Sequence, residues 1–279
     1  MANILIVGCG GIGCELGLTL IQQGHTVYGI RRHTDLLPDG IQPIEADIAH
    51  PLNDLPENLD YVFYSASAGK HKDVAYYQAY VSGVKHTLKA LEGQNIKRIF
   101  FISSSSVFGQ DEGEKVTEES PTSGNNFSTK RLLEGEELIN NSHFASTVVR
   151  FGGIYGPGRT HLIDLIQQGK AHCMEDVYSN RIHSADCVGI LAHLLNLNEQ
   201  DPKLVDSLYI GVDDQPTPSC EVYEWLAEQL SVGHIEHIEP TENSRLMRSN
   251  KRLSNAKIRA TGYDFKYPTY QDGYSELIQ

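Results

Sequence analysis

The feature that most constrains the fold is an apolar run at residues 4–7 that leads directly into a glycine-rich turn. Gly8, Gly10 and Gly13 stand there at the spacing G-x-G-x-x-G. The first glycine permits a tight turn, the second lets backbone approach a pyrophosphate, and the third lets a helix pack closely on the strand. The start of such a helix offers unpaired N–H groups and a partial positive charge to phosphates. An incidental glycine turn is the alternative, but a motif between an opening strand and a helix favours a dinucleotide site.

Short runs rich in Ile, Val, Phe and Tyr alternate with helical segments through the first 150 residues. Continuous apolar strands separated by helices are typical of a parallel sheet covered on both faces. Right-handed crossovers then predict an α/β fold of the Rossmann type, with a doubly wound parallel sheet. We expect strands at residues 3–7, 25–30, 42–46, 60–64, 97–103 and 146–151, with helices near 11–23, 73–92 and 126–140.

The pattern changes after Phe151, where residues 152–159 are rich in glycine and proline and predict a loop. A helix near residues 184–197 and a strand near 207–210 are expected to return to the first sheet, and a further helix is expected around 220–230. We therefore predict a dinucleotide-binding domain over residues 1–155 and a smaller, partly interleaved substrate lobe over 156–279. Parts of that lobe, about 184–212, would rejoin the first domain.

The end of the second predicted strand bears on which nicotinamide cofactor is bound. A protein that reads NAD usually has Asp or Glu there, which accepts hydrogen bonds from the ribose 2′-hydroxyl. This chain has Arg31 and Arg32, and two guanidinium groups suit the additional phosphate of NADP. A solvated surface pair is the alternative. Asp47, after the third strand, either accepts from an adenine amino group or caps the following turn.

Composition and charge exclude several other classes of protein. The formal net charge of −13 gives no basic field that would displace counterions from nucleic acid. The chain enters a strand pattern at once, which leaves no room for a signal peptide, and no run reaches 18 apolar residues. These features predict a cytoplasmic protein that spans no membrane.

Five cysteines, an odd number, are spread along the chain without a C-x-x-C pair: Cys9, Cys14, Cys173, Cys187 and Cys220. This pattern indicates neither a disulfide framework nor a zinc site. His234 and His237 lie close together but lack a second ligand pair at metal spacing, so we interpret them as a solvated strand end and expect no metal.

Three further segments resemble the extended or atypical short-chain dehydrogenase/reductase superfamily, often called the NAD-dependent epimerase/dehydratase family. They are S-S-S-S-V-F-G at 103–109, R-F-G-G-I-Y-G-P-G-R at 150–159 and N-R-I-H-S-A-D at 180–186. With the glycine turn they span about residues 1–190 in the order of that superfamily. The run N-K-R-L-S-N at 250–255, followed by Gly262 and Tyr267-Pro268, is similar to its YeeZ-like branch.

The resemblance implies hydride transfer assisted by a hydroxyl residue, a tyrosine and a lysine, in which the tyrosine is the acid/base and the lysine lowers its pKa. Ser104 matches the hydroxyl residue and Lys130 matches the lysine. The tyrosine should then stand at position 126, which is Asn126, and none of the fourteen tyrosines has a lysine four residues later. An asparagine amide does not titrate near neutral pH, so it cannot replace a phenol in proton transfer.

The remaining site assignments follow the same resemblance and the glycine turn. For the cofactor we expect Gly8, Gly10, Gly11, Ile12, Gly13, Arg31, Arg32, Asp47, Ser67, Ser103, Lys130, Gly153 and Ile154. For the substrate we expect Ser105, Tyr155, Arg159, Arg181 and His183. A helix cap made by His183, Ser184 and Asp186 is the alternative at that last segment.

Two functions of different classes remain open from the sequence. One is an NADP-dependent oxidoreductase or epimerase that acts on a small carbonyl or sugar-nucleotide substrate. The other is a cofactor-binding or redox-sensing protein that has lost its chemistry with the family tyrosine. We expect a small-molecule substrate as partner and no nucleic acid, and leave open whether the chain forms a homodimer.

Overall fold

The computed structural model describes residues 1–238 and 250–278. The chain divides into two compact units, each built from three separate stretches of sequence. Unit 1 comprises residues 1–107, 123–150 and 188–209, and unit 2 comprises 108–122, 151–187 and 210–279. Compared with the boundary expected near residue 155, the structure also assigns residues 108–122 to unit 2.

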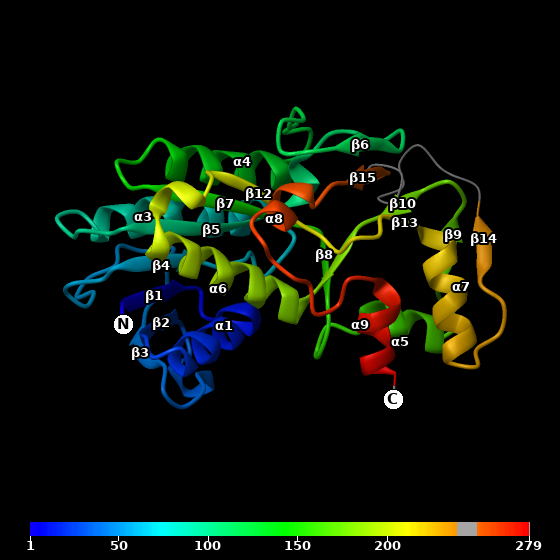
Figure 1. Cartoon of the computed structure of the whole chain (residues 1–279), viewed down its shortest axis with the longest axis horizontal. Coiled ribbons are helices and arrows are strands. Elements are labelled where there is room, and N and C mark those ends of the chain that lie inside the picture. The colour runs from blue at the N-terminus through cyan, green and yellow to red at the C-terminus, as the bar shows by residue number, and fades with distance from the viewer. Residues whose placement is uncertain (239–249, 279) are drawn as a thin grey trace. The chain divides into compact units, whose positions relative to one another are not determined.

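A seven-stranded sheet forms the framework of unit 1 (Figure 1). β1 pairs in parallel with both β2 and β4, so the strand order reverses direction at this point. The order β12-β7-β5-β4-β1-β2-β3 is that of a doubly wound Rossmann sheet, and the predicted fold class is confirmed. The strands are β1 (Asn3–Val7), β2 (Thr26–Arg31), β3 (Gln42–Glu45), β4 (Tyr61–Tyr64), β5 (Arg98–Ser104), β7 (Ser146–Phe151) and β12 (Leu208–Gly211).

Helices cover both faces of this sheet, with α4 on one face and α1 and α6 on the other (Figure 1). The helices of this part of the chain are α1 (Gly11–Gln22), α2 (Asp73–Tyr77), α3 (Gly83–Ala90), α4 (Phe127–Asn140) and α6 (Ser184–Gln200). Of the helices in the described residues, none combines the length and apolar character that crossing a bilayer requires.

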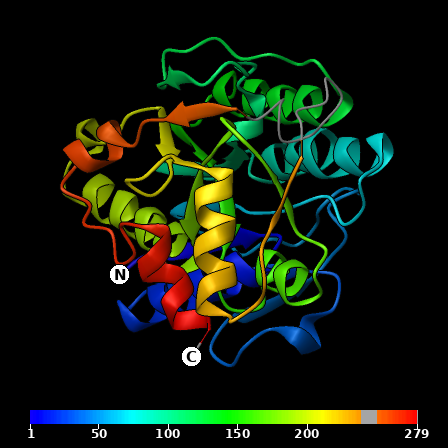
Figure 2. The same cartoon turned by 90° about the vertical axis from the view of Figure 1, so that its right-hand side faces the viewer.

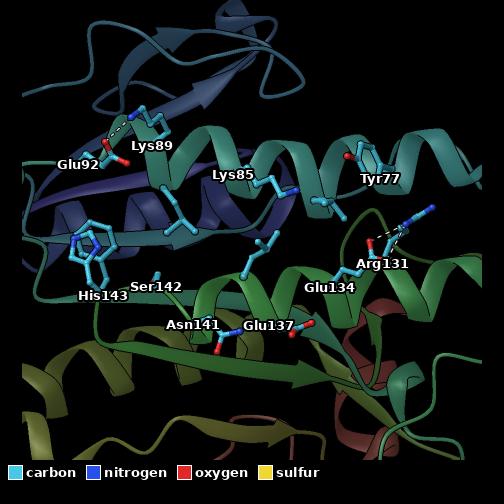
Figure 3. Close-up of a pocket in the computed structure, with 14 residues that line it drawn as sticks. Tyr77, Lys85, Lys89, Glu92, Arg131, Glu134, Glu137, Asn141, Ser142 and His143 are labelled. Carbon is cyan, nitrogen blue, oxygen red and sulfur yellow. Dashed lines mark hydrogen bonds and ion pairs between the residues drawn. The ribbon is translucent and has the colours of Figure 1, made fainter.

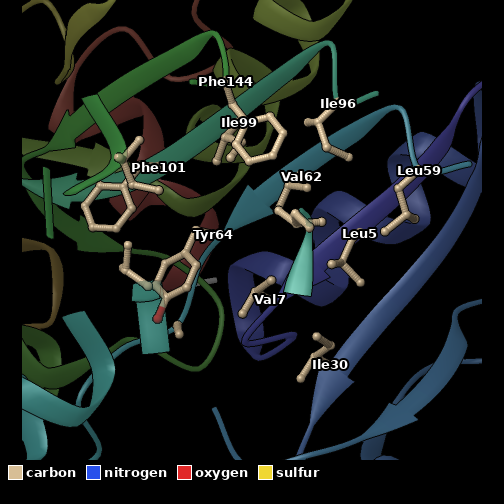
Figure 4. Close-up of a cluster of buried hydrophobic side chains, with 14 of the residues drawn as sticks. Leu5, Val7, Ile30, Leu59, Val62, Tyr64, Ile96, Ile99, Phe101 and Phe144 are labelled. Carbon is tan, nitrogen blue, oxygen red and sulfur yellow. The ribbon is translucent and has the colours of Figure 1, made fainter. Parts of the chain in front are cut away.

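The strands form where the sequence is continuously apolar because both of their faces are buried. Every residue of β4 is buried, as are Ile4, Leu5, Ile6 and Val7 in β1. Leu5, Val62 and Phe101 contribute to one core cluster that β5 and the loop after α4 complete (Figure 4). Phe63 also stacks on Phe100 with ring centroids 4.7 Å apart.

The helix expected over residues 73–92 is interrupted by a π-helical turn at Gln78–Ser82. Here the hydroxyl of Tyr64 donates to the carbonyl of Ala79, and a side chain at Gly83 would meet that hydroxyl. Insertion of a side chain into the helical hydrogen-bond ladder is a common cause of such a bulge. The apolar pattern of the segment carries no trace of this polar contact, so the sequence predicted one continuous helix.

In its described residues, unit 2 contains short strands in four two-stranded sheets together with four helices. β8 pairs in parallel with β11, β9 with β14, and β6 with β15, while β10 and β13 are antiparallel. The strands are β6 (Glu114–Val116), β8 (Gly153–Tyr155), β9 (His172–Met174), β10 (Tyr178–Ser179), β11 (Arg181–His183), β13 (Thr217–Pro218), β14 (Glu236–Ile238) and β15 (Lys251–Leu253). The helices are α5 (His161–Gln167), α7 (Ser219–Gln229), α8 (Ala256–Ala260) and α9 (Tyr270–Leu277).

The apolar core of unit 2 lies among α5, α7 and α9 (Figure 2). Ile166, Leu226 and Tyr270 represent these three helices in one buried cluster. Cys173 and Cys220 belong to the same cluster and form a disulfide. The cysteine pattern was interpreted as indicating no disulfide framework, and this pair corrects that interpretation. The 47 residues between them concealed a contact that depends on the docking of α7 against β9.

Candidate functional site

The glycine turn after β1 lies where the strand order of the sheet reverses, the position at which doubly wound sheets bind ligands. Gly8 adopts a φ of +79°, and its N–H donates to the carbonyl of Ile30 at 3.1 Å. On the neighbouring strand, Ser65 Oγ donates to Gly8 O at 3.0 Å. β1, β2 and the residue after β4 therefore hold one face of the turn in place.

The three glycines of the motif differ in what surrounds them. A Cβ at Gly8 would lie 2.5 Å from the backbone nitrogen of Ala66, and one at Gly13 would lie 2.9 Å from Ser65 Oγ. A Cβ at Gly10 would meet nothing nearer than Gly8 O at 3.9 Å. Gly8 and Gly13 are thus required by packing within the protein, whereas the free space at Gly10 fits the approach of a ligand.

The start of α1 is shaped to receive an anion. Its N-cap is Gly10, which has no side chain to bond the first N–H groups of the helix. Gly11 is exposed, while Ile12 is buried. The residues present therefore fit the pyrophosphate of a dinucleotide through backbone donors and the helix dipole.

Arg31 lies beside this turn, and Arg32 next to it is exposed. Arg31 Nη1 donates to Cys9 O at 3.5 Å and to Leu36 O at 3.3 Å. These bonds hold the Arg31 guanidinium near the glycine turn.

Asp47 and Ser67 were both assigned to the cofactor. Asp47 Oδ1 accepts from the N–H of Ala49 at 3.0 Å, so the turn-capping role is present, and its second oxygen is not part of that bond. Ser67 is exposed beyond the end of β4. Ser65, which the sequence reasoning missed, makes the contact with the turn. A serine directly after a buried strand next to β1 is the signal that would have found it.

The serines at the end of β5 have separate surroundings. Ser103 is buried, and its hydroxyl donates to Glu136 Oε1 at 2.6 Å, so a cofactor contact from Ser103 would use its backbone. Ser104 Oγ accepts from the N–H of Ser106 at 3.2 Å, which leaves the Ser104 hydroxyl proton available to another acceptor. Ser105 follows in a 3₁₀ turn, Ser105–Val107, and is half-buried.

A buried ion pair fixes β5 and β7 to α4. Arg150 donates from Nε to Glu136 Oε1 at 3.0 Å and from Nη2 to Glu136 Oε2 at 2.6 Å. Both residues are less than a tenth exposed, and Ser103 joins them. Breaking such a buried pair by removing one partner typically costs about 3–5 kcal/mol. The pair therefore determines where α4 and the end of β5 stand.

Asn126, at the position of the expected tyrosine, is the N-cap of α4. Its Oδ1 accepts from the N–H of Thr129 at 3.0 Å and from the hydroxyl of Ser128 at 2.5 Å. Thr129 completes a capping box by accepting from the N–H of Asn126. Lys130 is the fourth residue of α4 and is exposed.

Three of the residues assigned to the substrate come together within unit 2. β8 and β11 set Tyr155 opposite His183, with ring centroids 5.3 Å apart, and Arg181 opposite Gly153. Tyr155 also stacks on Tyr274 of α9 at 4.3 Å. Burial raises the pKa of Tyr155 and lowers the pKa of His183, so both groups favour their neutral forms.

This cluster contains buried polar atoms without a hydrogen-bond partner among the described residues. They are the Tyr155 hydroxyl, Arg181 Nη1, His183 Nε2 and Asp213 Oδ2. Burial raises the pKa of Asp213 to about 7, against the opposing effect of the Arg181 guanidinium. Buried polar groups are normally paired, so such a set is typical of a binding site. Asp213, the residue missed by the sequence reasoning, lies two residues after the end of β12.

Residues 183–186 also make local hydrogen bonds of the kind that the alternative, a helix cap, requires. His183 Nδ1 accepts from the N–H of Ala185 at 3.2 Å, so Nε2 carries the proton of the neutral ring. Asp186 is fully buried and accepts from the Tyr263 hydroxyl at 2.8 Å and from two backbone N–H groups, those of Lys266 and Tyr267. Asp186 thus anchors residues 263–267.

The remaining predicted residues of unit 2 lie in β8 and in the turn that follows it. Gly153 is exposed and Ile154 is half-buried in β8. Arg159 is exposed, and its N–H donates to Gly156 O at 2.9 Å across a tight turn. Ser104 and Lys130 belong to unit 1, whereas Arg159, Arg181 and His183 belong to unit 2.

A cavity of about 880 Å³ lies elsewhere in unit 1, between α3 and α4 (Figure 3). Tyr77, Lys85, Glu137 and His143 are among its lining residues. Ion pairs at its rim join Lys89 to Glu92 and Arg131 to Glu134. None of the residues predicted for cofactor or substrate lines this cavity, so it is separate from the glycine turn.

The doubly wound sheet, the open helix start after Gly10 and the arginine beside it define a dinucleotide-binding protein of the Rossmann class. Residues 4–200 match the model of the NAD dependent epimerase/dehydratase family. The chain therefore belongs to this family, and its cofactor class is a nicotinamide dinucleotide.

Relatives and solved structures are consistent with that membership. Short-chain dehydrogenase/reductase family 42E member 1 of Xenopus laevis is 31% identical over 82% of this chain and 68% of its own length. Protein YeeZ of Escherichia coli K12 is 25% identical over 96% of this chain and 97% of its own. A structure from Methylobacillus flagellatus, provisionally assigned as an NAD-dependent epimerase/dehydratase, superimposes with a TM-score of 0.82 at 34% identity. It covers 99% of this chain and 97% of its own.

Proposed function

We propose that the protein is an NADP-preferring oxidoreductase or epimerase that acts on a small carbonyl or sugar-nucleotide substrate. The observation that carries the proposal is the pairing of an open helix start at Gly10 with the Arg31 guanidinium beside it. The bound nicotinamide would supply or accept a hydride. The protein would supply backbone donors for the pyrophosphate and a positive charge for the 2′-phosphate.

Arg31 and Arg32 supply the test of cofactor preference. We expect wild type to bind NADPH more tightly than NADH. The double variant Arg31→Ala/Arg32→Ala should lose about 1.5–3 kcal/mol of NADPH binding, roughly 10- to 150-fold, because a charge-assisted bond is lost. NADH affinity serves as the internal control and should change little. Equal affinities for the two cofactors in wild type would refute the preference for NADP.

The buried cluster of unit 2 supports a second part of the proposal, that Arg181, His183 and Tyr155 bind the substrate. Arg181 Nη1 and His183 Nε2 are donors, and the Tyr155 hydroxyl both donates and accepts, so the set suits a substrate rich in oxygen atoms. Arg181→Met should raise KM while leaving NADPH affinity unchanged. A variant that instead weakens NADPH binding would place Arg181 with the cofactor.

An enzymatic mechanism would also need a group that transfers a proton to or from the substrate. Ser104 keeps a free hydroxyl proton and is suited to orient a substrate oxygen. Neither a serine hydroxyl nor the Asn126 amide is an effective acid at neutral pH. General acid catalysis contributes about 10²–10⁴-fold, so we expect slow reduction of generic carbonyls.

A cofactor-binding protein without chemistry is the second candidate, and the capping role of Asn126 favours it. A panel of aldehydes, ketones and nucleotide sugars with NADPH separates the two candidates. Turnover that Ser104→Ala reduces supports the enzyme, whereas tight NADPH binding without turnover on any substrate supports the sensor. The same preparation, analysed by light scattering, would test a homodimer, and fractionation of cells would test the proposed cytoplasmic location.

A further inference from the structure

Two cysteines and a histidine from three separate elements meet on unit 2. Cys173 lies on β9 and His237 on β14, where the two residues are direct partners in the parallel pairing. Cys220 is the second residue of α7. The two sulfur atoms and a ring nitrogen of His237 all lie within 4.8 Å of one another. The sequence spacing predicted no metal here because these ligands come from distant parts of the chain.

The backbone around the two sulfurs is held by bonds other than the disulfide. Ser219, directly before Cys220, donates from its hydroxyl to Met174 O at 3.0 Å and from its N–H to Val177 O at 2.8 Å. Both cysteines are also buried in the apolar cluster of α5, α7 and α9. The two side chains would therefore remain neighbours after the disulfide is reduced. The start of α7 would in addition favour the thiolate form of Cys220.

His237 is the exposed member of the group and is flanked by carboxylates. Its Nδ1 lies 3.0 Å from Glu175 Oε1, and its Nε2 lies 2.7 Å from Glu224 Oε1. Histidine ligands of metals usually donate their second ring N–H to a carboxylate. Whichever nitrogen of His237 binds a metal, the other one keeps such a partner. The three residues leave the fourth position of a tetrahedral zinc to water or to another ligand.

We propose that reduced Cys173 and Cys220, together with His237, form a zinc site that exists only when the disulfide is open. Two thiolates and an imidazole are ligands that Zn²⁺ prefers, and two thiolates balance its charge. Tetrahedral bonds of about 2.3 Å to zinc would separate the two sulfurs by about 3.8 Å, so the metal and the disulfide exclude each other.

Conversion of the disulfide form to the zinc-bound form needs a reductant, which an external dithiol or two external thiols can supply. The disulfide accepts two electrons and two protons to give two cysteine thiols, while the external thiols become a disulfide. Zn²⁺ then replaces the two thiol protons, which pass to solvent. This inference uses only residues of unit 2 and does not depend on the proposed nicotinamide chemistry.

Zinc titration of the whole chain tests the proposal. Protein reduced with a phosphine and freed of reductant without air should compete with a chromophoric chelator for one Zn²⁺ per chain, whereas the oxidised protein should not. Co²⁺ added to the reduced protein should produce thiolate-to-cobalt charge-transfer absorption. Equal zinc binding by the two states, or cobalt binding without that absorption, would overturn the proposal.

Matched variants assign the ligands. His237→Ala and Cys173→Ser should abolish stoichiometric binding, while His234→Ala and Cys14→Ser should retain it. Glu224→Gln should weaken binding by about 10–100-fold if the carboxylate supports the ligand histidine. Unchanged zinc affinity in His237→Ala would overturn the assignment.

A measurement on wild type avoids any dependence on the folding of variants. Zn²⁺ should protect Cys173 and Cys220 of the reduced protein from alkylation, as mapped by mass spectrometry, and should leave Cys14 as reactive as before. Zn²⁺ should also raise the melting temperature of the reduced form alone, because a ligand stabilises the state that binds it. Alkylation of all three cysteines at unchanged rates would contradict the site.

Discussion

α1 and α4 both begin beside the carboxyl ends of the sheet strands in unit 1, but their first turns differ. α1 follows Gly10, which offers no side chain to its first N–H groups. α4 follows Asn126, whose side chain accepts from Thr129 and Ser128. The start of α1 has no side-chain cap and can bind an external anion, whereas the start of α4 is capped by side chains of the chain itself. The difference separates the cofactor binding that we propose for the start of α1 from the proton transfer that a tyrosine at position 126 would supply.

The contrast between Gly8 and Gly10 gives the largest expected effect. Gly8→Ala would place a side chain at positive φ against the backbone of Ala66, and should lower the free energy of unfolding by at least about 2–3 kcal/mol. Gly10→Ala would place its Cβ at an ordinary contact distance, 3.9 Å from Gly8 O, and should change the free energy of unfolding by less than about 0.5 kcal/mol. Urea unfolding of both variants measures the difference. Equal losses would show that Gly10 also serves packing.

A larger side chain at Gly10 tests whether the open helix start binds the cofactor. Gly10→Val should fold but lose roughly 100-fold in NADPH affinity, about 2.7 kcal/mol, because the side chain holds the pyrophosphate away from the backbone. Fluorescence titration with NADPH measures this loss, and circular dichroism checks the fold. A folded variant with wild-type affinity would place the dinucleotide elsewhere.

Two substitutions of Asn126 test how much its side-chain cap stabilises α4. Asn126→Ala removes the acceptor of the capping box and should cost about 1 kcal/mol of stability, whereas Asn126→Asp keeps it and should cost far less. Thermal unfolding of the two variants compares them. If Asn126→Ala were as stable as wild type, the cap would not explain why asparagine stands at this position.

Restoring a phenol gives the smallest expected effect. We expect Asn126→Tyr to raise carbonyl turnover by less than about tenfold, well below the 10²–10⁴-fold of a well-placed acid, because the substitution also loses the cap of α4. Asn126→Phe is the control, since it carries the ring without the hydroxyl. A hundredfold increase seen with Tyr but not with Phe would show that Lys130 and Ser104 still form a complete active site.

The local sequence pattern was sufficient to predict most of the strands of unit 1. The six predicted strands matched those of the structure to within about one residue. Strands buried on both faces, such as β4, must be continuously apolar, whereas β3 is a mostly exposed edge strand. The motif glycines and their separate roles could be assigned from the sequence, but the groups that constrain Gly8 and Gly13 could not, because these are Ala66 and Ser65, which follow a neighbouring strand. The π turn before α3 depends in the same way on Tyr64.

Unit 2 was harder to predict because its contacts are made between distant segments. Tyr155, Arg181 and His183 could be placed together through their resemblance to a family, yet Asp213 could be added only from the structure. The disulfide between Cys173 and Cys220 and its neighbour His237 left no local spacing to recognise. Short strands with few residues carry little periodicity, so the pairings of β8, β9 and β11 had no signal of their own.

The interleaving of the two units has a consequence for how the chain is made. The polypeptide passes from one unit to the other five times, after residues 107, 122, 150, 187 and 209. During synthesis the first 107 residues emerge with β5 as an unprotected sheet edge, because β7 begins only at Ser146. No cut in the gene would release either unit as an intact fragment. A nascent chain must wait until most of it has left the ribosome, and its dependence on chaperones should be greatest in that interval.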